Sequence, residues 1–234
     1  MEVWSSVVDI ATSWALPVPC QYPLGDALEM FSNPSKKPMA LLVGAMGMYG
    51  SDHPWEIPYN LSVRLGIECL DAKSIKDVGE NGLRRALCGR PALHVSPPKM
   101  GTWISRAADF VVGQYDGDPA LIWNRGSGIE AQRLIRRLVD VPGIGNVKAL
   151  AFTFLLGRDW DVDINEWDRV DIESNSDINR VLIRLGIVNP PRPIDPKTVV
   201  AIWEGLRRIG KTYCVLDNPR CAECPMIGCR KKGV

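Results

Sequence analysis

Four cysteines near the end of the chain have a spacing that could bind a metal. They follow the pattern Cys-x6-Cys-x2-Cys-x4-Cys and are Cys214, Cys221, Cys224 and Cys229. The segment 1–19 carries acidic residues and lacks the basic start of a secretory signal, so we expect an intracellular protein. Thiols stay reduced there, and four of them in one short loop favour a metal over two disulfides. The spacing is compatible with zinc held by four sulfurs and with a 4Fe-4S cluster.

A glycine turn between two helical segments could bind an anion. Residues 138–149 read Leu-Val-Asp-Val-Pro-Gly-Ile-Gly-Asn-Val-Lys-Ala, with Gly143 and Gly145 separated by one residue. Glycine has no Cβ and adopts positive φ, so the backbone can approach a partner closely. The amides of such a turn and of the next helix's first turn form a concavity that suits phosphate. A plain helix–helix connection ending in glycine explains the same pattern equally well.

Two further stretches carry chemically useful side chains. Residues 47–55 interrupt an apolar run and could line a pocket with Tyr49, Asp52, His53 and Trp55, although a surface loop is the alternative. Residues 157–177 hold eight carboxylates. Such a run is typically a solvated face that repels polyanions, although one carboxylate could point into a cleft.

Helical periodicity positions these residues. Ile129, Leu134, Leu138 and Val141 recur at helical spacing before the glycine turn, and 149–156 is apolar on nearly all sides, which predicts a buried second helix. Further helices are expected over 3–16, 24–31, 38–46, 57–65, 74–88, 100–112, 177–185 and 196–213. Strand alternation is limited to short ambiguous runs, so the sequence predicts an all-α fold.

Composition sets the outer limits. The chain has 234 residues, of which 46% are hydrophobic, so it can form one large domain or two modest ones. Its net charge is +1, so any contact with a polyanion must use a local patch. No apolar run reaches membrane-spanning length, and we expect a protein that acts without a membrane.

Three motifs together resemble a known family. The helix–Pro-Gly-x-Gly–helix segment comes first, residues 178–186 then read Ile-Asn-Arg-Val-Leu-Ile-Arg-Leu-Gly, and the four-cysteine loop follows. In this order they resemble the endonuclease III-like branch of the helix-hairpin-helix DNA glycosylases. The resemblance is strong over 133–229 and covers only the helix order over 24–112. The last cysteine spacing is one residue shorter than is usual in the family.

The resemblance implies two helical lobes with a DNA-binding cleft between them. One lobe would be 27–158, with the hairpin at about 133–155, and the other 1–26 plus 159–234, with an iron–sulfur loop at 214–229. Within the family, a 4Fe-4S cluster is favoured over zinc. The implied protein is a monomer, cytoplasmic or nucleoid-associated. Its partner would be duplex DNA with a damaged or mismatched base, which is flipped out and excised.

The chain departs from the family pattern at the chemical positions. Val147 stands where lyases carry their Schiff-base lysine, and Lys148 follows one residue later. Asn175 stands at the catalytic aspartate position, which leaves Asp171 as the nearest substitute, followed by Asp177. Met46 stands where a glutamine commonly fills the gap left by the flipped base, and it could act as a wedge by shape.

These departures leave two functional hypotheses. The first is a DNA glycosylase without lyase activity, in which Asp171 activates water or Asn175 holds it. The second is a catalytically silent helix-hairpin-helix iron–sulfur protein that only binds DNA. The pocket segment favours the enzyme. In both cases the resemblance implies DNA contacts by Gly143, Gly145, Lys148, Arg220 and Lys231.

Overall fold

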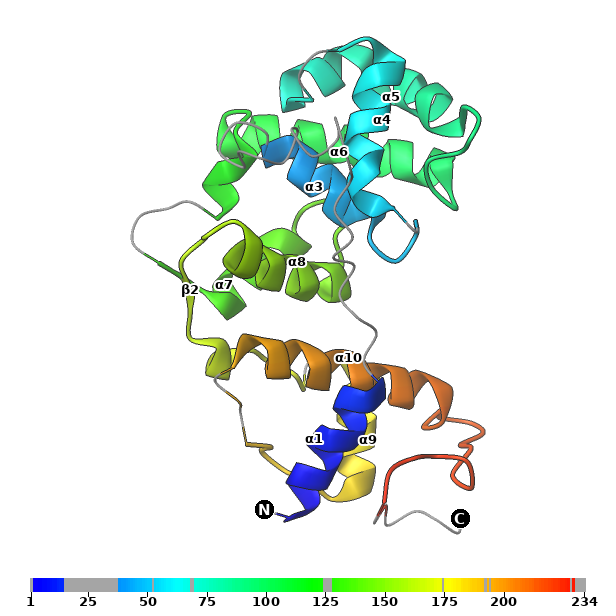
Figure 1. The fold of residues 1–234 in the computed structure, drawn as a ribbon, viewed down its shortest axis with the longest axis vertical. Coiled ribbons are helices and arrows are strands. Elements are labelled where there is room, and N and C mark those ends of the chain that lie inside the picture. The colour runs from blue at the N-terminus through cyan, green and yellow to red at the C-terminus, as the bar shows by residue number, and fades with distance from the viewer. Residues whose placement is uncertain are drawn as a thin grey trace. The chain divides into compact units, whose positions relative to one another are not determined.

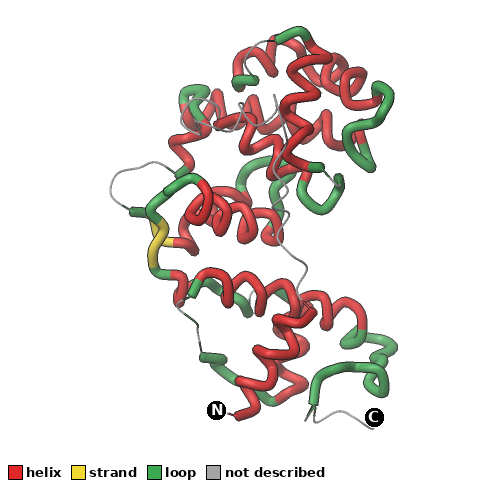
Figure 2. The backbone as a smooth tube through the Cα atoms, in the orientation of Figure 1, coloured by secondary structure: helices red, strands yellow, loops and turns green. Residues whose placement is uncertain are grey.

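The computed structural model confirms the all-α prediction. The structure describes residues 2–14, 38–51, 53–67, 70–123, 128–173, 175–191, 193, 195–227 and 229. Within these ranges nearly all regular structure is helical, and one short pair of strands accompanies it (Figure 2). The helix expected over 24–31 lies outside the described residues, as do Asp52 and Lys231. No helix in the described ranges is long and apolar enough to span a membrane.

The chain divides into two compact units. Unit 1 comprises 1–17, 130–132 and 164–234, and unit 2 comprises 18–129 and 133–163. The divisions expected from the sequence fall after 26 and after 158.

Unit 1 is built around a long C-terminal helix (Figure 1). Its elements are α1 (Glu2–Trp14), β2 (Ile164–Asn165), η3 (Trp167–Arg169), α9 (Ser176–Leu185) and α10 (Pro196–Thr212). Helix α10 packs against both α1 and α9. Its contact with α1 is made through backbone, because a Cβ at Gly205 would lie 1.8 Å from the carbonyl oxygen of Ala11. The end of α10 is also fixed on α1, since the rings of Tyr213 and Trp14 meet edge to face at 5.2 Å.

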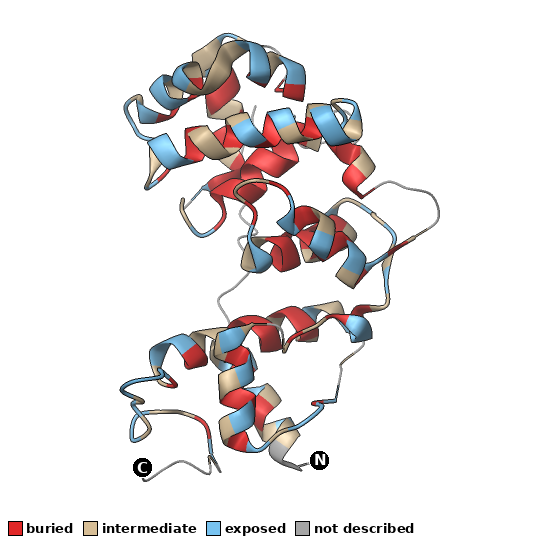
Figure 3. Ribbon diagram, turned by 180° about the vertical axis from the view of Figure 1, so that it is seen from behind, coloured by how far each residue is buried: buried red, intermediate tan, exposed pale blue. Residues whose placement is uncertain are grey.

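Unit 2 holds the remaining elements. They are α3 (Pro38–Gly47), η1 (Pro54–Glu56), α4 (Ile57–Leu65), α5 (Ala72–Cys88), α6 (Pro97–Tyr115), η2 (Pro119–Ile122), most of α7 (Ala131–Val139) and α8 (Asn146–Asp159). The two residues of strand β1 (Ile129–Glu130) are divided between the units, with Ile129 in unit 2 and Glu130 in unit 1. Helix α3 is the centre of this unit, because every residue from Met39 to Gly47 is buried (Figure 3). Helices α5 and α6 lie closely together, with Gly101 against the backbone of Arg84.

Several helices begin one to three residues earlier than the sequence predicts. The largest difference is at α6, which covers Pro97–Tyr115 where a helix was expected over 100–112. The helix expected over 74–88 is α5, which begins at Ala72. Asp71 is the residue that caps it, because its Oδ1 accepts a hydrogen bond from the Ser74 N–H at 2.8 Å. Aspartate is a good N-cap, which explains the earlier start of the helix.

Candidate functional site

The glycine turn is an ordered connection between α7 and α8. The Ile144 N–H donates to the carbonyl of Val141 at 3.0 Å, and both of these side chains are buried. Gly143 has a φ of 89°, which favours glycine. A Cβ there would also lie 2.7 Å from Cβ of Trp103 in α6. Glycine is therefore required at 143 by backbone conformation and by the close approach to Trp103.

Gly145 leaves the beginning of α8 open. It is the N-cap residue of this helix, is exposed, and would have no atom within 4 Å of an added Cβ. Glycine has no side chain that can accept hydrogen bonds from the first-turn amides. The first N–H groups of a helix lack partners within it, and the helix dipole is positive at that end. The arrangement suits an anion, as the glycine spacing predicts.

The hairpin lysine points into unit 2, which differs from the expected phosphate contact. Nζ of Lys148 donates hydrogen bonds to the carbonyl oxygen of Met46 and, at 3.4 Å, to that of Gly143. It also lies 4.8 Å from the centroid of the Trp103 ring. Burial lowers the pKa of Lys148 to about 8, and the positive charge of Lys99 contributes. The neighbouring Val147 is half-buried and has no amine.

The predicted catalytic residues lie at the entry to α9 in unit 1. Oδ1 of Asn175 caps this helix by accepting from the N–H groups of Asp177 at 3.0 Å and Ile178 at 3.2 Å. Oδ1 of Asp171 accepts from the Glu173 N–H at 3.0 Å. The Asp171 N–H donates to the side chain of Gln132 at 2.7 Å. The side chain of Asp177, the next candidate, pairs with Arg180.

Two of the predicted pocket and wedge residues are part of the core. Met46 is fully buried in α3, so it presents no wedge at the surface of unit 2. Trp55 is also fully buried, and its ring packs against Phe152 at 6.4 Å and Trp160 at 5.6 Å. The indole of Trp55 can approach α3 this closely because residue 44 is glycine. A Cβ at Gly44 would lie 2.4 Å from the ring. Both apolar side chains gain more from burial than from a place in a polar loop.

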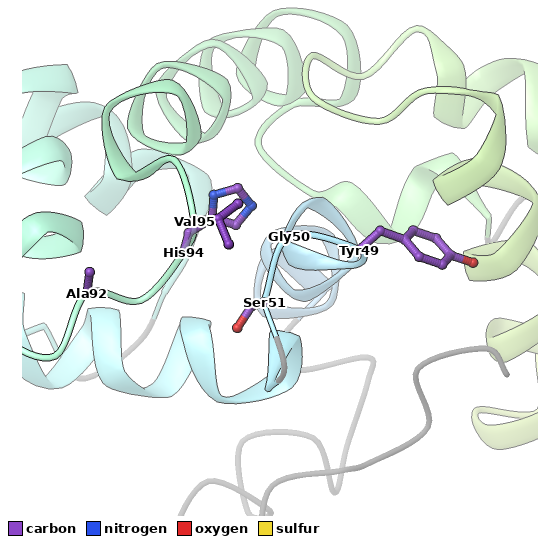
Figure 4. Close-up of a pocket in the computed structure, with 6 residues that line it drawn as sticks. All are labelled: Tyr49, Gly50, Ser51, Ala92, His94 and Val95. Carbon is purple, nitrogen blue, oxygen red and sulfur yellow. The ribbon is translucent and has the colours of Figure 1, made fainter. Parts of the chain in front are cut away.

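A pocket does open beside Tyr49. It has a volume of about 440 Å³ and is lined by Tyr49, Gly50, Ser51, Ala92, His94 and Val95 (Figure 4). Tyr49 is partly exposed and has a φ of 62°. Of the other predicted pocket residues, His53 is exposed and has Nδ1 3.9 Å from a carboxylate oxygen of Glu56. Asp52 is among the residues that the structure does not describe.

The opposite wall of this pocket is formed by Ala92, His94 and Val95, which the sequence does not indicate as pocket residues. His94 is buried, and its Nδ1 accepts a hydrogen bond from the Ser96 N–H at 3.0 Å. Burial lowers the pKa of His94, and the charge of Lys148 lowers it further, so the imidazole is neutral near pH 7. The imidazole lies directly against the backbone of Gly50, where an added Cβ would be 2.1 Å from Nε2 of His94, so only glycine fits at 50. The only cue in the sequence is a histidine within a proline-rich connector.

The cysteine loop is connected to α9 by two arginines of the 178–186 motif. Arg180 donates to the carbonyl of Cys214, and Nη1 of Arg184 donates to Sγ of Cys214 at 3.2 Å. The Cys229 thiol in turn lies 3.7 Å from the carbonyl oxygen of Arg184. The helix motif and the cysteine loop are therefore in direct contact within unit 1.

The four thiols fit a metal group by their chemistry. Each of them is free, and burial raises the pKa of Cys224, to which the charges of Cys214, Cys229 and Cys221 add. The described residues do not, however, contain three or more His, Cys, Asp or Glu side chains arranged as metal ligands. The donor set therefore fits a cluster, while the ligand geometry is not preformed in these residues.

Of the two predicted C-terminal DNA contacts, only Arg220 is described. Its guanidinium is half-exposed, pairs with Glu223 and lies 5.6 Å from the ring of Tyr213. Glu223 would compete with a phosphate for this arginine. Lys231 falls in the final residues, which the structure does not describe.

Comparison with protein-family models gives no match. Comparison with curated protein sequences gives none either. Among solved structures, a thermostable thymine-DNA glycosylase is similar at 10% identity, with 95% of this chain and 91% of that chain covered and a TM-score of 0.42. A trapped endonuclease III–DNA covalent intermediate in an estranged-adenine complex and a non-covalent endonuclease III–DNA complex are similar at 15% identity. Each covers 98% of this chain and 94% of its own, with TM-scores of 0.44 and 0.42. Such scores do not define a common fold.

Proposed function

We propose that this protein binds duplex DNA through the hairpin and excises a damaged or mismatched base without a Schiff-base lysine. The observation that carries the proposal is the open N-terminus of α8 at Gly145, next to a turn that Gly143 fixes on Trp103. In the sequence this hairpin precedes the α9 motif and the cysteine loop, which are connected by Arg180 and Arg184.

DNA binding is proposed to use backbone amides first. The N–H groups of Gly145 and the first turn of α8 would donate to phosphate oxygens, and the helix dipole would favour the negative charge. The net charge of +1 provides no general attraction to DNA. Affinity should nevertheless fall with rising salt, because each neutralised phosphate releases counterions.

The proposed chemistry is hydrolysis of the N-glycosidic bond. A water oxygen forms the new bond to the sugar C1′, and the bond from C1′ to the base breaks. The base leaves with the electron pair and takes up a proton from solvent, while the proton removed from the attacking water passes to a general base and from there to solvent. Asp171 is proposed to accept the proton of the water, because a carboxylate can do so and the neutral amide of Asn175 cannot. Lyase activity is not expected, because Val147 offers no amine and Lys148 is engaged with two carbonyls.

The cysteines are proposed to hold a 4Fe-4S cluster, with zinc as the alternative occupant. Cys214, Cys221, Cys224 and Cys229 would each supply a thiolate, and the Arg184 guanidinium would donate to the sulfur of Cys214. The cluster would supply structural cross-linking of the loop to the end of α10. A visible absorbance band of the purified protein distinguishes a cluster from colourless zinc.

The enzyme proposal is tested by single-turnover reactions on short duplexes. The substrates carry uracil, thymine opposite guanine, an oxidised pyrimidine, 8-oxoguanine or an alkylated purine. We expect release of at least one base, loss of that release in Asp171→Asn, and no strand cleavage before alkali is added. Release of no base, with duplex binding retained, would contradict it.

The second candidate is a DNA-binding protein without catalysis. The observation that favours it is Asn175, whose side-chain oxygen is used to cap α9 while no carboxylate stands at that position. If Asp171→Asn releases the nucleobase as fast as the unmodified protein, Asp171 is not the general base, although the protein is still a glycosylase. Binding without release on every substrate would support the second candidate.

A further inference from the structure

Lys148 connects two segments of unit 2 that are far apart in the sequence. One of its two carbonyl partners is Met46, in the last turn of α3, and the other is Gly143, in the hairpin turn. The turn that follows Met46 carries Tyr49 and Gly50, which form one wall of the pocket. A single ammonium group therefore bridges the hairpin and the pocket rim.

The indole of Trp103 is the common support for both ends of this bridge. The Lys148 ammonium lies over the ring, and the backbone of Gly143 packs against Cβ of the same residue. On the pocket side, the ring of His94 meets Trp103 edge to face, with the centroids 6.4 Å apart. The hairpin, the lysine and the pocket wall thus share one rigid side chain of α6.

The charges around Lys148 indicate a role inside the unit. The titratable groups that face it are Lys99, whose Nζ lies 5.0 Å from the same ring, and His94. No ion pair among the described ranges includes Lys148 or Lys99. Backbone carbonyls, and not a carboxylate, are therefore the partners of a half-buried cation. A phosphate-binding lysine would instead keep its ammonium in water until DNA arrives.

We propose that Lys148 is a positioning residue, which holds the hairpin amides and the pocket rim at Tyr49–Ser51 in a fixed arrangement. Its effect on DNA binding rests on the proposed function. The link itself lies within unit 2 and exists without DNA, so the two can fail separately.

The link is tested first by amide hydrogen exchange of the free protein. Lys148→Met keeps an unbranched side chain over Trp103 but removes the donors to both carbonyls. We expect several-fold faster exchange at Met48 and Gly50 and also at Ile144, whose amides are hydrogen-bonded in these turns. Lys99→Met is the matched control, because it removes the neighbouring charge without touching either carbonyl, and it should leave both segments unchanged. Faster exchange in the hairpin alone, or equal effects of the two variants, would overturn the inference.

The consequence is tested with a duplex that carries a tetrahydrofuran abasic site. Lys148→Met should bind it about tenfold more weakly, as expected for lost charge-assisted hydrogen bonds, with the slope of log affinity against log salt unchanged. A lost phosphate contact would instead reduce that slope by about 1. Lys148→Arg should recover most of the affinity because it can donate to both carbonyls. A reduced slope, or no recovery by arginine, would overturn the positioning role. Failure of the unmodified protein to bind any duplex would count against the proposed function, while the exchange result would still decide the link.

Discussion

At the scale of single residues, Asn175 is a good helix cap but cannot act as a general base. Its side-chain oxygen accepts hydrogen bonds from two amides at the start of α9, which is the ordinary work of an N-cap. An aspartate would make the same contacts and would add a charge that the helix dipole favours. The position therefore keeps the structural function of an acidic residue without its ability to take a proton.

This separation predicts different outcomes for two substitutions at 175. Asn175→Ala should lower the free energy of unfolding by about 1 kcal/mol, because two amides of α9 lose their acceptor. Asn175→Asp should keep the stability of the unmodified protein, since the cap is preserved. If the protein is a glycosylase, the added carboxylate should also raise the rate of base release. Urea denaturation and single-turnover assays measure the two effects. Equal stability of Asn175→Ala and the unmodified protein would show that the cap contributes nothing.

Residue types also show what the sequence could not establish. The amphipathic spacing of Leu134 and Leu138 predicts the buried face of α7, and both side chains are buried. Trp55 lies in a polar segment and reads as a pocket residue, yet it packs on Gly44 and Phe152. His94 is brought to Gly50 only by the tertiary fold. Contacts of this kind depend on packing between distant segments, which periodicity does not encode.

At the scale of elements, the two glycines of the hairpin have different roles, one in the packing of the turn and one in the access to the helix N-terminus. Gly143 needs its positive φ and its contact with Trp103, so it fixes the turn on α6. Gly145 has an ordinary φ of −93° and open space around it, so nothing in unit 2 requires a glycine there. The absence of a side chain at 145 is instead what keeps the amides of α8 accessible.

The difference predicts a matched pair of effects. Gly143→Ala should destabilise the protein by about 1–3 kcal/mol, because it combines a strained backbone with a clash. Gly145→Ala should cost less than about 1 kcal/mol, the difference between glycine and alanine at an N-cap. Gly145→Ala should nevertheless weaken duplex binding, since its methyl group stands where a phosphate would approach. Thermal unfolding and fluorescence-anisotropy titration separate these effects. Similar stability losses in both variants would show that the packing of the turn depends on Gly145 as much as on Gly143.

The ends of helices could be predicted from the sequence better than the contacts that the helices make. Gly186 ends α9 in the left-handed conformation at a φ of 71°, as the sequence pattern predicts. The start of α5 differs from the expected one by two residues, because Asp71 accepts hydrogen bonds from the backbone N–H and the hydroxyl of Ser74 and so caps the helix earlier. The contacts of Arg180 and Arg184 with the cysteine loop had no signal beyond the order of the motifs.

At the scale of the whole molecule, Lys148 makes stability depend on pH in an unusual direction. The ordinary pKa of lysine is about 10.4, and burial in the folded protein lowers that of Lys148 to about 8. Below pH 8 the folded and unfolded chains both carry this proton. Between about pH 8 and pH 10 the folded chain has released it while the unfolded chain still binds it. The unfolded state then holds more protons, so the contribution of Lys148 to the stability must rise with pH across this window.

The test compares the unmodified protein with Lys148→Met, because other groups also titrate in this range. We expect the urea midpoint of the unmodified protein to rise relative to that of the variant as the pH is raised through the window, and to stay constant relative to it below pH 8. Lys148 is only half-buried, so solvent screening reduces the size of the effect but leaves its sign unchanged. Lys99→Met should act differently, since removing its charge raises the pKa of Lys148 and moves the onset of the rise to higher pH. A relative midpoint that falls with pH would mean that the folded protein binds this proton more tightly than the unfolded chain. That result would place a negative partner beside Lys148 in place of the two carbonyls.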